Sequence, residues 1–327
     1  MISLSCNPLP PVRYGGIEQV ISNLTRGLVA AGAGVTCYCP GTLGFEGARQ
    51  VRTLPEPSPG PKEGVFEPNS PAHIDAIVAG LKSQAAPGDI IHLHHDGQWA
   101  LLRPRLGWLW RQRRTFVETA HWKRTGLNRN VIYPSKALAE KIGHPGSVAA
   151  HGIDLDIFGP VSDRTRQGHL LYAGRVTPDK GVHLAVEACR LAGRELHIAG
   201  PLPDEAYAEQ ILPRCRWLGE MEPAQLAAAY RAAHGLVYLS QYTEPFGLAP
   251  VEAMACGCPV ITTGCGGCGE TVLDGRTGFF AETPEQIAQA VDKLDTLCRD
   301  DIIQRGRQYS IEAMTQKYLT FYRGLHA

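Results

Sequence analysis

Three things are missing from this chain of 327 residues, and each absence excludes a class of protein. No stretch approaches the roughly 20 consecutive apolar residues that a membrane-spanning helix needs. The N-terminus, MISLSCNPLPPVRYGG, lacks the basic start and apolar core of a secretion signal, so we expect a soluble, cytoplasmic protein. Net charge is also lacking. Residues 1–158 hold 16 Lys and Arg against 12 Asp and Glu, an excess too small to predict a nucleic-acid partner.

The composition is that of an ordinary globular protein, with 44% hydrophobic and 20% charged residues. Its ten cysteines lie in apolar or Gly-rich segments and do not form the dense framework of a disulfide-stabilised domain, so reduced, buried thiols are expected. Single cores rarely grow beyond roughly 250 residues, so the length predicts two domains.

Apolar, strand-like runs alternate with amphipathic helical runs in both halves of the chain, which predicts an α/β fold with doubly wound parallel sheets. Strands are expected over residues 2–6, 35–40, 89–95, 115–121, 168–174, 195–200, 234–240 and 258–264, and helices over 15–32, 182–193, 222–233, 248–257 and 302–327. The stretch 157–167 is short on periodicity and contains Pro160, which indicates a linker. The proline-rich stretch 54–71 is interpreted as a surface loop of the first domain.

The most informative segment is SQYTEPFGLAPVEAMACGCPVITTGCGGCGETV, which contains two glutamates, Glu244 and Glu252, eight positions apart. Pro250 suits a first helical turn and Gly257 suits a helix end, which would place Glu252 in the first turn and Glu244 in the preceding loop. Backbone amides would then face outward at the positive end of the helix, ready for diphosphate or sugar oxygens. These amides belong to Phe246, Gly247 and Leu248.

Two further segments point to phosphate. In LLYAGRVTPDKGVHLAVEA, a strand leads to Arg175 and Lys180 in a loop that opens a helix, and these cations suit a diphosphate that gains charge as its bond to a sugar breaks. In PVRYGGIEQV, Gly15 and Gly16 precede a helix, where missing side chains let the backbone approach a phosphate.

Taken together, these segments resemble the family-4 retaining glycosyltransferases of the GT-B fold, the group 1 glycosyl transferases, over nearly the whole chain. YGGIEQVISNL, FVETAH, HGIDLDIFGP, GRVTPDKG and EPFGLAPVEAMACGCPVI follow in the order of the family's motifs. The resemblance implies two Rossmann-like domains facing across a cleft: residues 1–158 for the acceptor and 159–305 for the nucleotide sugar. It also implies a C-terminal helix, 306–327, that crosses back to the first domain.

The same resemblance implies roles for individual residues. Arg175 and Lys180 would bind the diphosphate, Glu252 the ribose hydroxyls, and Glu244 a hydroxyl of the transferred sugar. His121 would lie beside that sugar. The segment that holds the base by its backbone would contain Trp217 and Leu218. His151 stands where Asn is commoner in such junctions, and no role is assigned to it.

The expected reaction is transfer of a sugar from a nucleotide diphosphate to an acceptor hydroxyl, by front-face substitution with retention of configuration. Among the nucleotides, UDP is weakly favoured. The enzyme would act by positioning and charge stabilisation, without a covalent nucleophile and without a metal. Alternatives are a nucleotide-sugar hydrolase or epimerase on the same fold, and a non-catalytic binding protein. The acceptor and the oligomeric state stay open.

Other motifs imitate known sites. The run His92, His94, His95, Asp96 and the cysteines 256, 258, 265 and 268 have metal-like spacing, but alternating strand positions put His92 and His94 on one face without His95. No metal site is therefore expected. Asp154 and Asp156 are interpreted as structural. The basic, aromatic segment Arg103 to Arg114 would contact anionic lipid or pack as an ordinary helix, and membrane contact is not favoured.

Overall fold

The computed structural model describes residues 1–3, 7–13, 15–42, 44–57, 69–95, 97–106, 115–122, 130–161 and 167–325. Its backbone contacts divide the chain into two compact units. Unit 1 contains Met1–Gly152 and Ile311–Ala327, and unit 2 contains Ile153–Ser310. Several predictions fall outside the described residues: Asp96, residues 4–6 of the first strand, 58–68 of the proline-rich loop, 107–114 of the basic segment and 162–166 of the linker.

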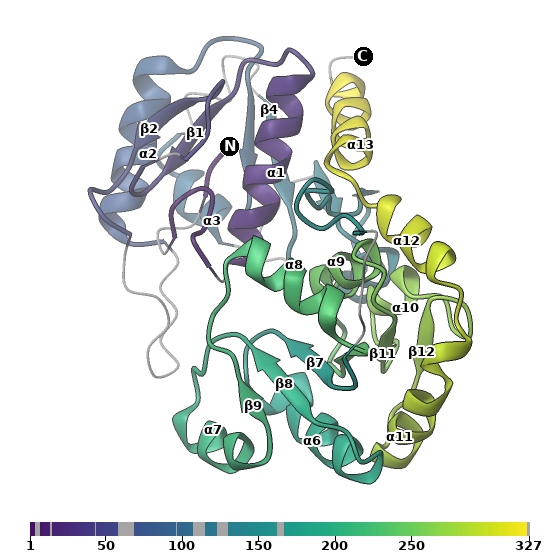
Figure 1. Cartoon of the computed structure of the whole chain (residues 1–327). Helices are drawn as coiled ribbons and strands as arrows, with labels where there is room; N and C mark the ends of the chain where they lie inside the picture. Colours follow the sequence, from purple (N-terminus) through teal and green to yellow (C-terminus); the bar gives the residue numbers. More distant parts are fainter. Residues whose placement is uncertain are drawn as a thin grey trace. The chain divides into compact units, whose positions relative to one another are not determined.

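Unit 1 is a parallel α/β unit (Figure 1). In chain order its elements are α1 (Gly16–Ala30), β1 (Thr36–Cys39), β2 (Arg49–Arg52), α2 (Pro71–Gln84), β3 (Ile90–Leu93), α3 (Gln98–Leu102), β4 (Thr115–Thr119), β5 (Val131–Tyr133), α5 (Lys136–Ile142), β6 (Ser147–Val148) and α13 (Ile311–Gly324). Ile2 bridges both Tyr38 and Leu93, so the first residues of the chain lie between β1 and β3. All strand pairs of this unit are parallel in the described residues.

The core of unit 1 forms because apolar residues recur on one face of α2 and along β3. Ile74, Ile77 and Leu81 of α2 pack with Ile91 and Leu93 in one buried cluster. Such burial stabilises the unit by about 25 cal/mol per Å² of apolar surface removed from water.

The last helix, α13, packs against α1, the first helix of unit 1. Close approach is possible because Gly27 has no side chain: a Cβ there would lie 1.9 Å from Thr315 Oγ1. Asn23, one turn earlier on α1, donates to the Gly152 carbonyl at 2.9 Å. Packing therefore joins α1 to the C-terminal helix, and a buried hydrogen bond joins α1 to Gly152.

Unit 2 is a second parallel α/β unit, built around a six-stranded sheet in the order β12-β11-β10-β7-β8-β9. Its elements are β7 (Leu170–Ala173), η1 (Pro178–Lys180), α6 (Val182–Leu191), β8 (Leu196–Ala199), α7 (Glu205–Ile211), η2 (Leu212–Arg214), β9 (Arg216–Trp217), α8 (Pro223–Ala232), β10 (Gly235–Tyr238), α9 (Leu248–Ala255), β11 (Val260–Thr262), α10 (Cys268–Thr271), β12 (Gly278–Phe280), α11 (Pro284–Lys293), η3 (Leu294–Thr296) and α12 (Arg299–Arg307).

The strand order of unit 2 fixes where a ligand is expected. From β7 the chain runs outward through α6 to β8, and after β9 it returns through α8 to β10 on the other side of β7. Figure 1 shows α6 and α11 on one face of the sheet and α8 and α9 on the other. The direction of winding reverses between β7 and β10, and ligands of such sheets bind at the carboxyl ends of the two strands at this switch point.

The C-terminal end of helix α9 is held by hydrogen bonds and by packing. Its C-terminus closes with hydrogen bonds from Gly257 N–H to the Met254 carbonyl and from Cys258 N–H to the Ala253 carbonyl, both 2.8 Å, and Gly257 adopts φ +76°. This αL end is the one predicted for Gly257. Helix α12 packs against α9, and a Cβ on Gly306 would lie 2.2 Å from the Ala255 nitrogen.

The C-terminal stretch corrects one prediction. Instead of one helix over 302–327, the chain forms α12 and α13, with a break at residues 308–310. At the break, Ile153 N–H donates to the Tyr309 carbonyl at 2.8 Å, and Ile153 pairs with Ser310 as an isolated bridge. This pairing with a distant segment replaces the helical hydrogen bonds, and periodicity alone does not reveal it.

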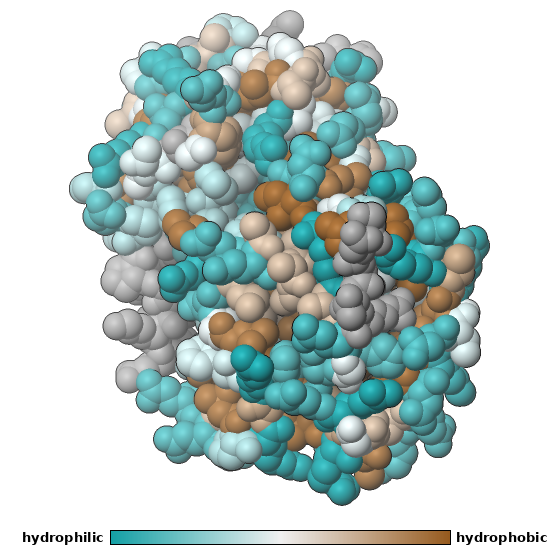
Figure 2. All heavy atoms as spheres, viewed as in Figure 1, coloured by the Kyte–Doolittle hydropathy of each residue, from teal (hydrophilic) through white to brown (hydrophobic). Residues whose placement is uncertain are grey.

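The described cysteines are all free. Six of them are buried as expected, whereas Cys265 and Cys298 are exposed and Cys215 is intermediate. No helix within the described residues is long and apolar enough to cross a membrane. On the face that Figure 2 shows, hydrophilic residues are interspersed with scattered hydrophobic ones.

Replacing Gly306 by Ala is expected to destabilise the protein by about 1 to 3 kcal/mol, because the added methyl group would overlap backbone atoms of α9. The matched control is Gly324→Ala, in α13, where a Cβ would meet nothing within 4 Å. This control should be neutral or slightly stabilising. Urea unfolding of the two variants makes the comparison, and equal midpoints for both would contradict the proposed close packing of α12 on α9.

Candidate active site

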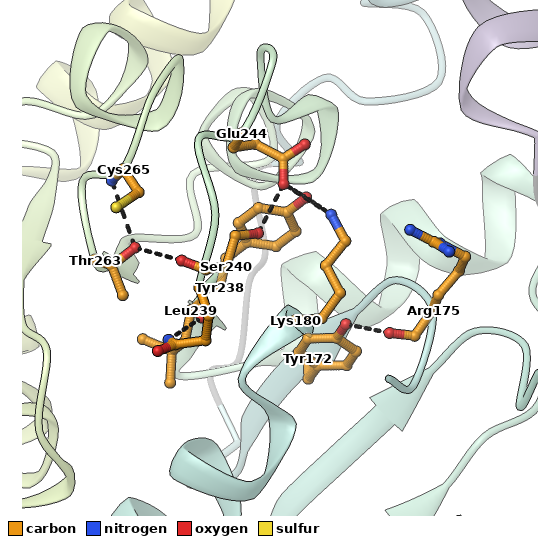
Figure 3. Close-up of polar contacts among 10 residues, drawn as sticks. Tyr172, Arg175, Lys180, Tyr238, Leu239, Ser240, Glu244, Thr263 and Cys265 are labelled. Carbon is orange, nitrogen blue, oxygen red and sulfur yellow. Dashed lines mark hydrogen bonds and ion pairs between the residues drawn. The ribbon is translucent and has the colours of Figure 1, made fainter. Parts of the chain in front are cut away.

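The switch point of unit 2 brings together two loops that the sequence had singled out. The loop after β7 carries Arg175 and Lys180, and the loop after β10 carries Ser240 and Glu244. Figure 3 shows Lys180 and Glu244 pointing toward one another from these two loops. The structure therefore joins the predicted cationic loop to the predicted glutamate motif.

Lys180 and Glu244 form a buried ion pair, with 2.7 Å between Lys180 Nζ and Glu244 Oε2. The same carboxylate oxygen accepts hydrogen bonds from Ser240 Oγ at 2.7 Å and Tyr238 Oη at 3.0 Å. Both charged side chains are about nine-tenths or more buried, so their attraction is little screened by solvent. Three donors on one oxygen hold the carboxylate in a single orientation.

Two tyrosine rings also contact the Lys180 ammonium. Nζ lies 4.8 Å from the ring centroid of Tyr242 and 5.3 Å from that of Tyr238. It also donates to Tyr238 Oη at 3.2 Å. Cation–π contacts of a desolvated ammonium are worth about 2 kcal/mol, so the rings add to the ion pair in fixing the charge.

The charge state of Glu244 follows from these neighbours. Burial would raise the pKa of its carboxyl, but the Lys180 charge and the hydrogen bonds from Lys180, Ser240 and Tyr238 outweigh it, so the pKa is held below its ordinary value. Glu244 is thus an ionised acceptor of hydrogen bonds. That chemistry suits the recognition of a hydroxyl group.

A Gly-rich loop supports Glu244 through its backbone. Glu244 pairs with Gly266 as an isolated bridge, and Gly267 N–H donates to the Glu244 carbonyl at 2.7 Å. A Cβ on Gly266 would lie 2.3 Å from that carbonyl, and one on Gly267 would lie 2.5 Å from Phe246 Cα. Only glycine permits this approach, which explains the glycines in GCGGCGE.

Glu252 lies in the second turn of α9, as its fifth residue, and not in the first turn as predicted. The helix begins at Leu248 as predicted, but a turn contains 3.6 residues, so the fifth residue lies beyond the first turn. Glu252 is buried and accepts a hydrogen bond from Tyr230 Oη at 3.1 Å. Burial raises the pKa of Glu252 to about 7, against the smaller lowering effect of the Tyr230 hydroxyl. The two motif glutamates therefore differ in the direction in which their surroundings shift the pKa.

The N-terminus of α9 follows Glu244 as predicted, with Gly247 at the cap position in the left-handed region at φ +87°. First-turn amides of a helix, such as that of Leu248, have no intrahelical acceptor and favour anions. Phe246 is buried and packs edge-to-face on Tyr309, with ring centroids 5.6 Å apart. The structure thus fixes the backbone of Phe246, Gly247 and Leu248 at a helix end.

Arg175 stands beside Lys180 in Figure 3. Its carbonyl oxygen accepts a hydrogen bond from Tyr172 Oη at 2.5 Å, which holds the loop that follows β7. Gly181, directly after Lys180, adopts φ +68°, and a Cβ there would lie 2.3 Å from the Leu239 carbonyl. The β7 loop and the end of β10 are packed backbone to backbone at this glycine.

The segment expected to hold a base is placed in β9 and just after it. Trp217 Nε1 donates to the Gly200 carbonyl at 3.0 Å. Leu218 N–H donates to the Ile198 carbonyl at 2.8 Å, so this amide is committed to the sheet. A base held by this backbone would therefore use a carbonyl oxygen of Trp217 or Leu218 and not the Leu218 amide.

In unit 1, Gly15 caps α1 and Gly16 is its first residue. A Cβ on Gly15 would lie 2.7 Å from Pro11 Cβ, so packing already requires this glycine. The buried carboxyl of Glu18 lies in the same first turn, and burial raises its pKa. The approach of a phosphate to Gly15 and Gly16 stays a prediction.

His121 follows β4 and belongs to a buried cluster of imidazoles in unit 1. His121 Nε2 lies 3.2 Å from His94 Nδ1, and its ring centroid lies 5.1 Å from that of His151. His92 and His94 have ring centroids 4.1 Å apart, which confirms that they share a face. Burial holds the pKa of His121 and His94 well below the ordinary value, so both rings are neutral at pH 7.

Sequence reasoning missed several residues of these sites. Ser240, Tyr230 and Tyr238 carry no spacing signal, because their hydrogen-bond partners lie 4 to 58 positions away along the chain. The half-buried Tyr242 was missed as well. Glu18 was visible in GGIEQV as an acidic residue of a first helical turn and could have been found there. Asp154 is accounted for locally, since its Oδ1 accepts from Asp156 N–H at 3.0 Å in a turn.

Two protein families match the two parts of the chain. "Glycosyltransferase Family 4" matches residues 14–157, and "Glycosyl transferases group 1" matches residues 157–314. A glycogen synthase of Mycobacterium tuberculosis (strain ATCC 25618 / H37Rv) is 29% identical over 345 residues, covering 85% of this chain and 81% of the relative.

Solved structures show the same fold, which is GT-B. Sucrose-phosphate synthase from Thermosynechococcus elongatus matches with a TM-score of 0.78 at 20% identity, covering 99% of this chain and 98% of that one. Anabaena HepE in complex with UDP-glucose matches with a TM-score of 0.68 at 16% identity, covering 99% and 98%.

Replacing Lys180 by Met is expected to destabilise the protein by about 3 to 5 kcal/mol, because it leaves the buried Glu244 carboxylate without its counter-charge. The double variant Lys180→Met with Glu244→Gln should recover much of this loss, since the charge is removed as well. Urea unfolding of the single and double variants tests the pair. A single variant as stable as the native protein would show that the ion pair is not formed.

The stability of the protein is expected to fall as pH rises through the range from about 4.5 to 7, in part because of Glu252. The pKa of this carboxyl is raised by folding from 4.5 to about 7, so the folded state binds the extra proton and loses stability as that proton leaves. In the isosteric variant Glu252→Gln, the free energy of unfolding should fall less with rising pH than in the native protein, by about 2 to 3 kcal/mol. Urea unfolding of both proteins at pH 5 and pH 8 measures it, and parallel pH profiles would contradict the raised pKa.

Proposed function

This chain belongs to the group 1, family 4 glycosyltransferases, and from that premise we propose that it transfers a sugar from a nucleoside diphosphate to an acceptor hydroxyl with retention of anomeric configuration. The observation that carries the proposal is the buried Lys180–Glu244 pair at the switch point of unit 2. The pair places a fixed cation beside a carboxylate that can accept a hydrogen bond from a hydroxyl group. A sugar joined to a diphosphate offers both a negative charge for the cation and hydroxyls for the carboxylate.

The donor is proposed to lie along the carboxyl ends of β7 and β10. Lys180 and Arg175 bind the diphosphate. The first-turn amides of α9, which follows Glu244 in the chain, are further donors for the diphosphate oxygens. Glu244 accepts a hydrogen bond from a hydroxyl of the transferred sugar. Glu252, one helical turn into α9, accepts hydrogen bonds from the ribose hydroxyls, which favours its ionised form and so releases a proton near neutral pH.

Retention of the anomeric configuration is supported by the hydrogen bonds that Glu244 already accepts. One oxygen of Glu244 accepts from Lys180, Tyr238 and Ser240, so this group is built to hold hydroxyls and is poorly placed to deprotonate an acceptor. We propose that a phosphate oxygen of the leaving group takes the acceptor's proton on the face that the diphosphate leaves. The cationic side chains stabilise the charge that develops there.

Metal independence is proposed on the same grounds. Lys180 and Arg175 can supply positive charge that a divalent ion supplies in other transferases. A UDP-sugar is the proposed donor, because a GT-B relative of similar fold is described in complex with UDP-glucose. Unit 1 is proposed to bind the acceptor. The relatives differ in what their names say they make, so the acceptor is left to experiment. The cytoplasmic location stays a prediction.

The proposal is tested by incubating the protein with UDP-, ADP- or GDP-glucose and a panel of sugars and polyols, in EDTA and in magnesium. We expect transfer that survives EDTA and gives the α-glycoside, judged by the anomeric proton coupling in NMR, since the donors are α-linked. A β-linked product would overturn retention, and activity only with magnesium would overturn metal independence. Free glucose or an epimerised donor formed without any acceptor would instead indicate a hydrolase or an epimerase.

A further inference from the structure

His94 holds the side chain of His121 by a direct hydrogen bond inside unit 1. The Nδ1 atom of His94 and the Nε2 atom of His121 are 3.2 Å apart, and the ring centroids are 5.5 Å apart. His94 is completely buried and follows β3, whereas His121 keeps a small exposed fraction of 7% and follows β4. Both residues therefore lie at the carboxyl edge of the parallel sheet, where ligands of such sheets bind.

The hydrogen bond couples the protonation of the two rings. Burial and the neighbouring imidazoles hold the pKa of both well below the ordinary value, so each ring is neutral and carries a single N–H. In the bond between them, one ring must donate and the other accept. The choice decides whether Nδ1 of His121 is a donor or an acceptor, and Nδ1 is the nitrogen that this bond leaves for a ligand.

His94 is itself held in place by a tilted ring contact with His92, and His92 is held by hydrogen bonds. Its ring lies against that of His92, with centroids 4.1 Å apart. Both nitrogens of His92 are engaged: Nδ1 with Tyr322 Oη at 2.6 Å and Nε2 with Thr119 Oγ1 at 2.8 Å. Tyr318 Oη lies 3.0 Å from the same Thr119 hydroxyl. The C-terminal helix α13 thus fixes His92, and His92 fixes the plane of His94.

We propose that His94 is a positioning residue for glycosyl transfer: it sets the orientation and the tautomer of His121, at the edge of the sheet of unit 1 where a substrate is expected. That a substrate meets His121 rests on the proposed function, in which unit 1 binds the acceptor, whereas the coupling of the two rings rests on their geometry. His94 Nε2 is buried and has no hydrogen-bond partner among the described residues, so the bond to His121 is the polar interaction that accounts for a histidine here.

The test uses His94→Leu, which removes the bond, and His94→Asn, whose amide lies where Nδ1 does and can restore it. Turnover is measured at saturating UDP-glucose with an acceptor selected in the panel above. We expect His94→Leu to lower kcat by about 10- to 100-fold, the scale of a small misplacement of a reacting group. His94→Asn should recover part of it.

A double-mutant comparison separates positioning from general loss of structure. In a His121→Ala background, His94→Leu should lower kcat no further, because the group on which it acts is gone. An equal further loss in that background would overturn the proposal, as would native turnover in His94→Leu.

The tautomer of His121 gives a readout that does not need activity. Long-range ¹H–¹⁵N spectra of the imidazoles in the whole protein should show one fixed tautomer of His121 in the native chain and a mixed or switched tautomer in His94→Leu. An unchanged His121 tautomer would overturn the coupling, even if no sugar is transferred. Absence of turnover in the native protein with a changed tautomer would instead reject the proposed function and keep the coupling.

Discussion

The ion pair between Lys180 and Glu244 is the constraint around which unit 2 is organised. Two charges that are about nine-tenths buried are tolerated only when paired and hydrogen-bonded, and this requirement accounts for Tyr238 and Ser240 around the carboxylate. It also accounts for glycine at positions 181 and 266, where any side chain would push apart the loops that carry the pair. The pair thus links local backbone geometry to the chemistry of the site.

Glu244 and Glu252 show how a common residue type is given two functions by its surroundings. Glu244 has a cation and two hydroxyl donors, and its pKa is lowered. Glu252 has burial and one hydroxyl donor, and its pKa is raised to about 7. The first is therefore an ionised group, whereas the second titrates near neutral pH and is ionised more readily when further hydrogen-bond donors reach it.

Unit 1 follows a different principle, because the buried histidines at the edge of its sheet are neutral. The imidazoles of His92, His94, His121 and His151 carry no charge at pH 7, since burial lowers the pKa of each. Hydrogen bonds between neutral groups depend on their direction more than on charge, so each ring of this cluster fixes the orientation of its neighbour. The two units accordingly bring different chemistry: fixed charge in unit 2 and oriented neutral groups in unit 1.

The sequence by itself determined the fold class and the family, and it singled out Lys180 and Glu244, which the structure brings together. Alternating strands and helices, the spacing of Glu244 and Glu252, and Gly257 at a helix end are local patterns, and local patterns are readable because they depend on nearest neighbours along the chain. The tertiary structure decided everything that depends on distant partners. It paired Lys180 with Glu244 across 64 positions, committed the Leu218 amide to a sheet, broke the last helix at residues 308–310, and set His94 against His121. These contacts form between strands that are neighbours in a sheet but far apart in sequence, and no periodicity along the chain records which strands those are.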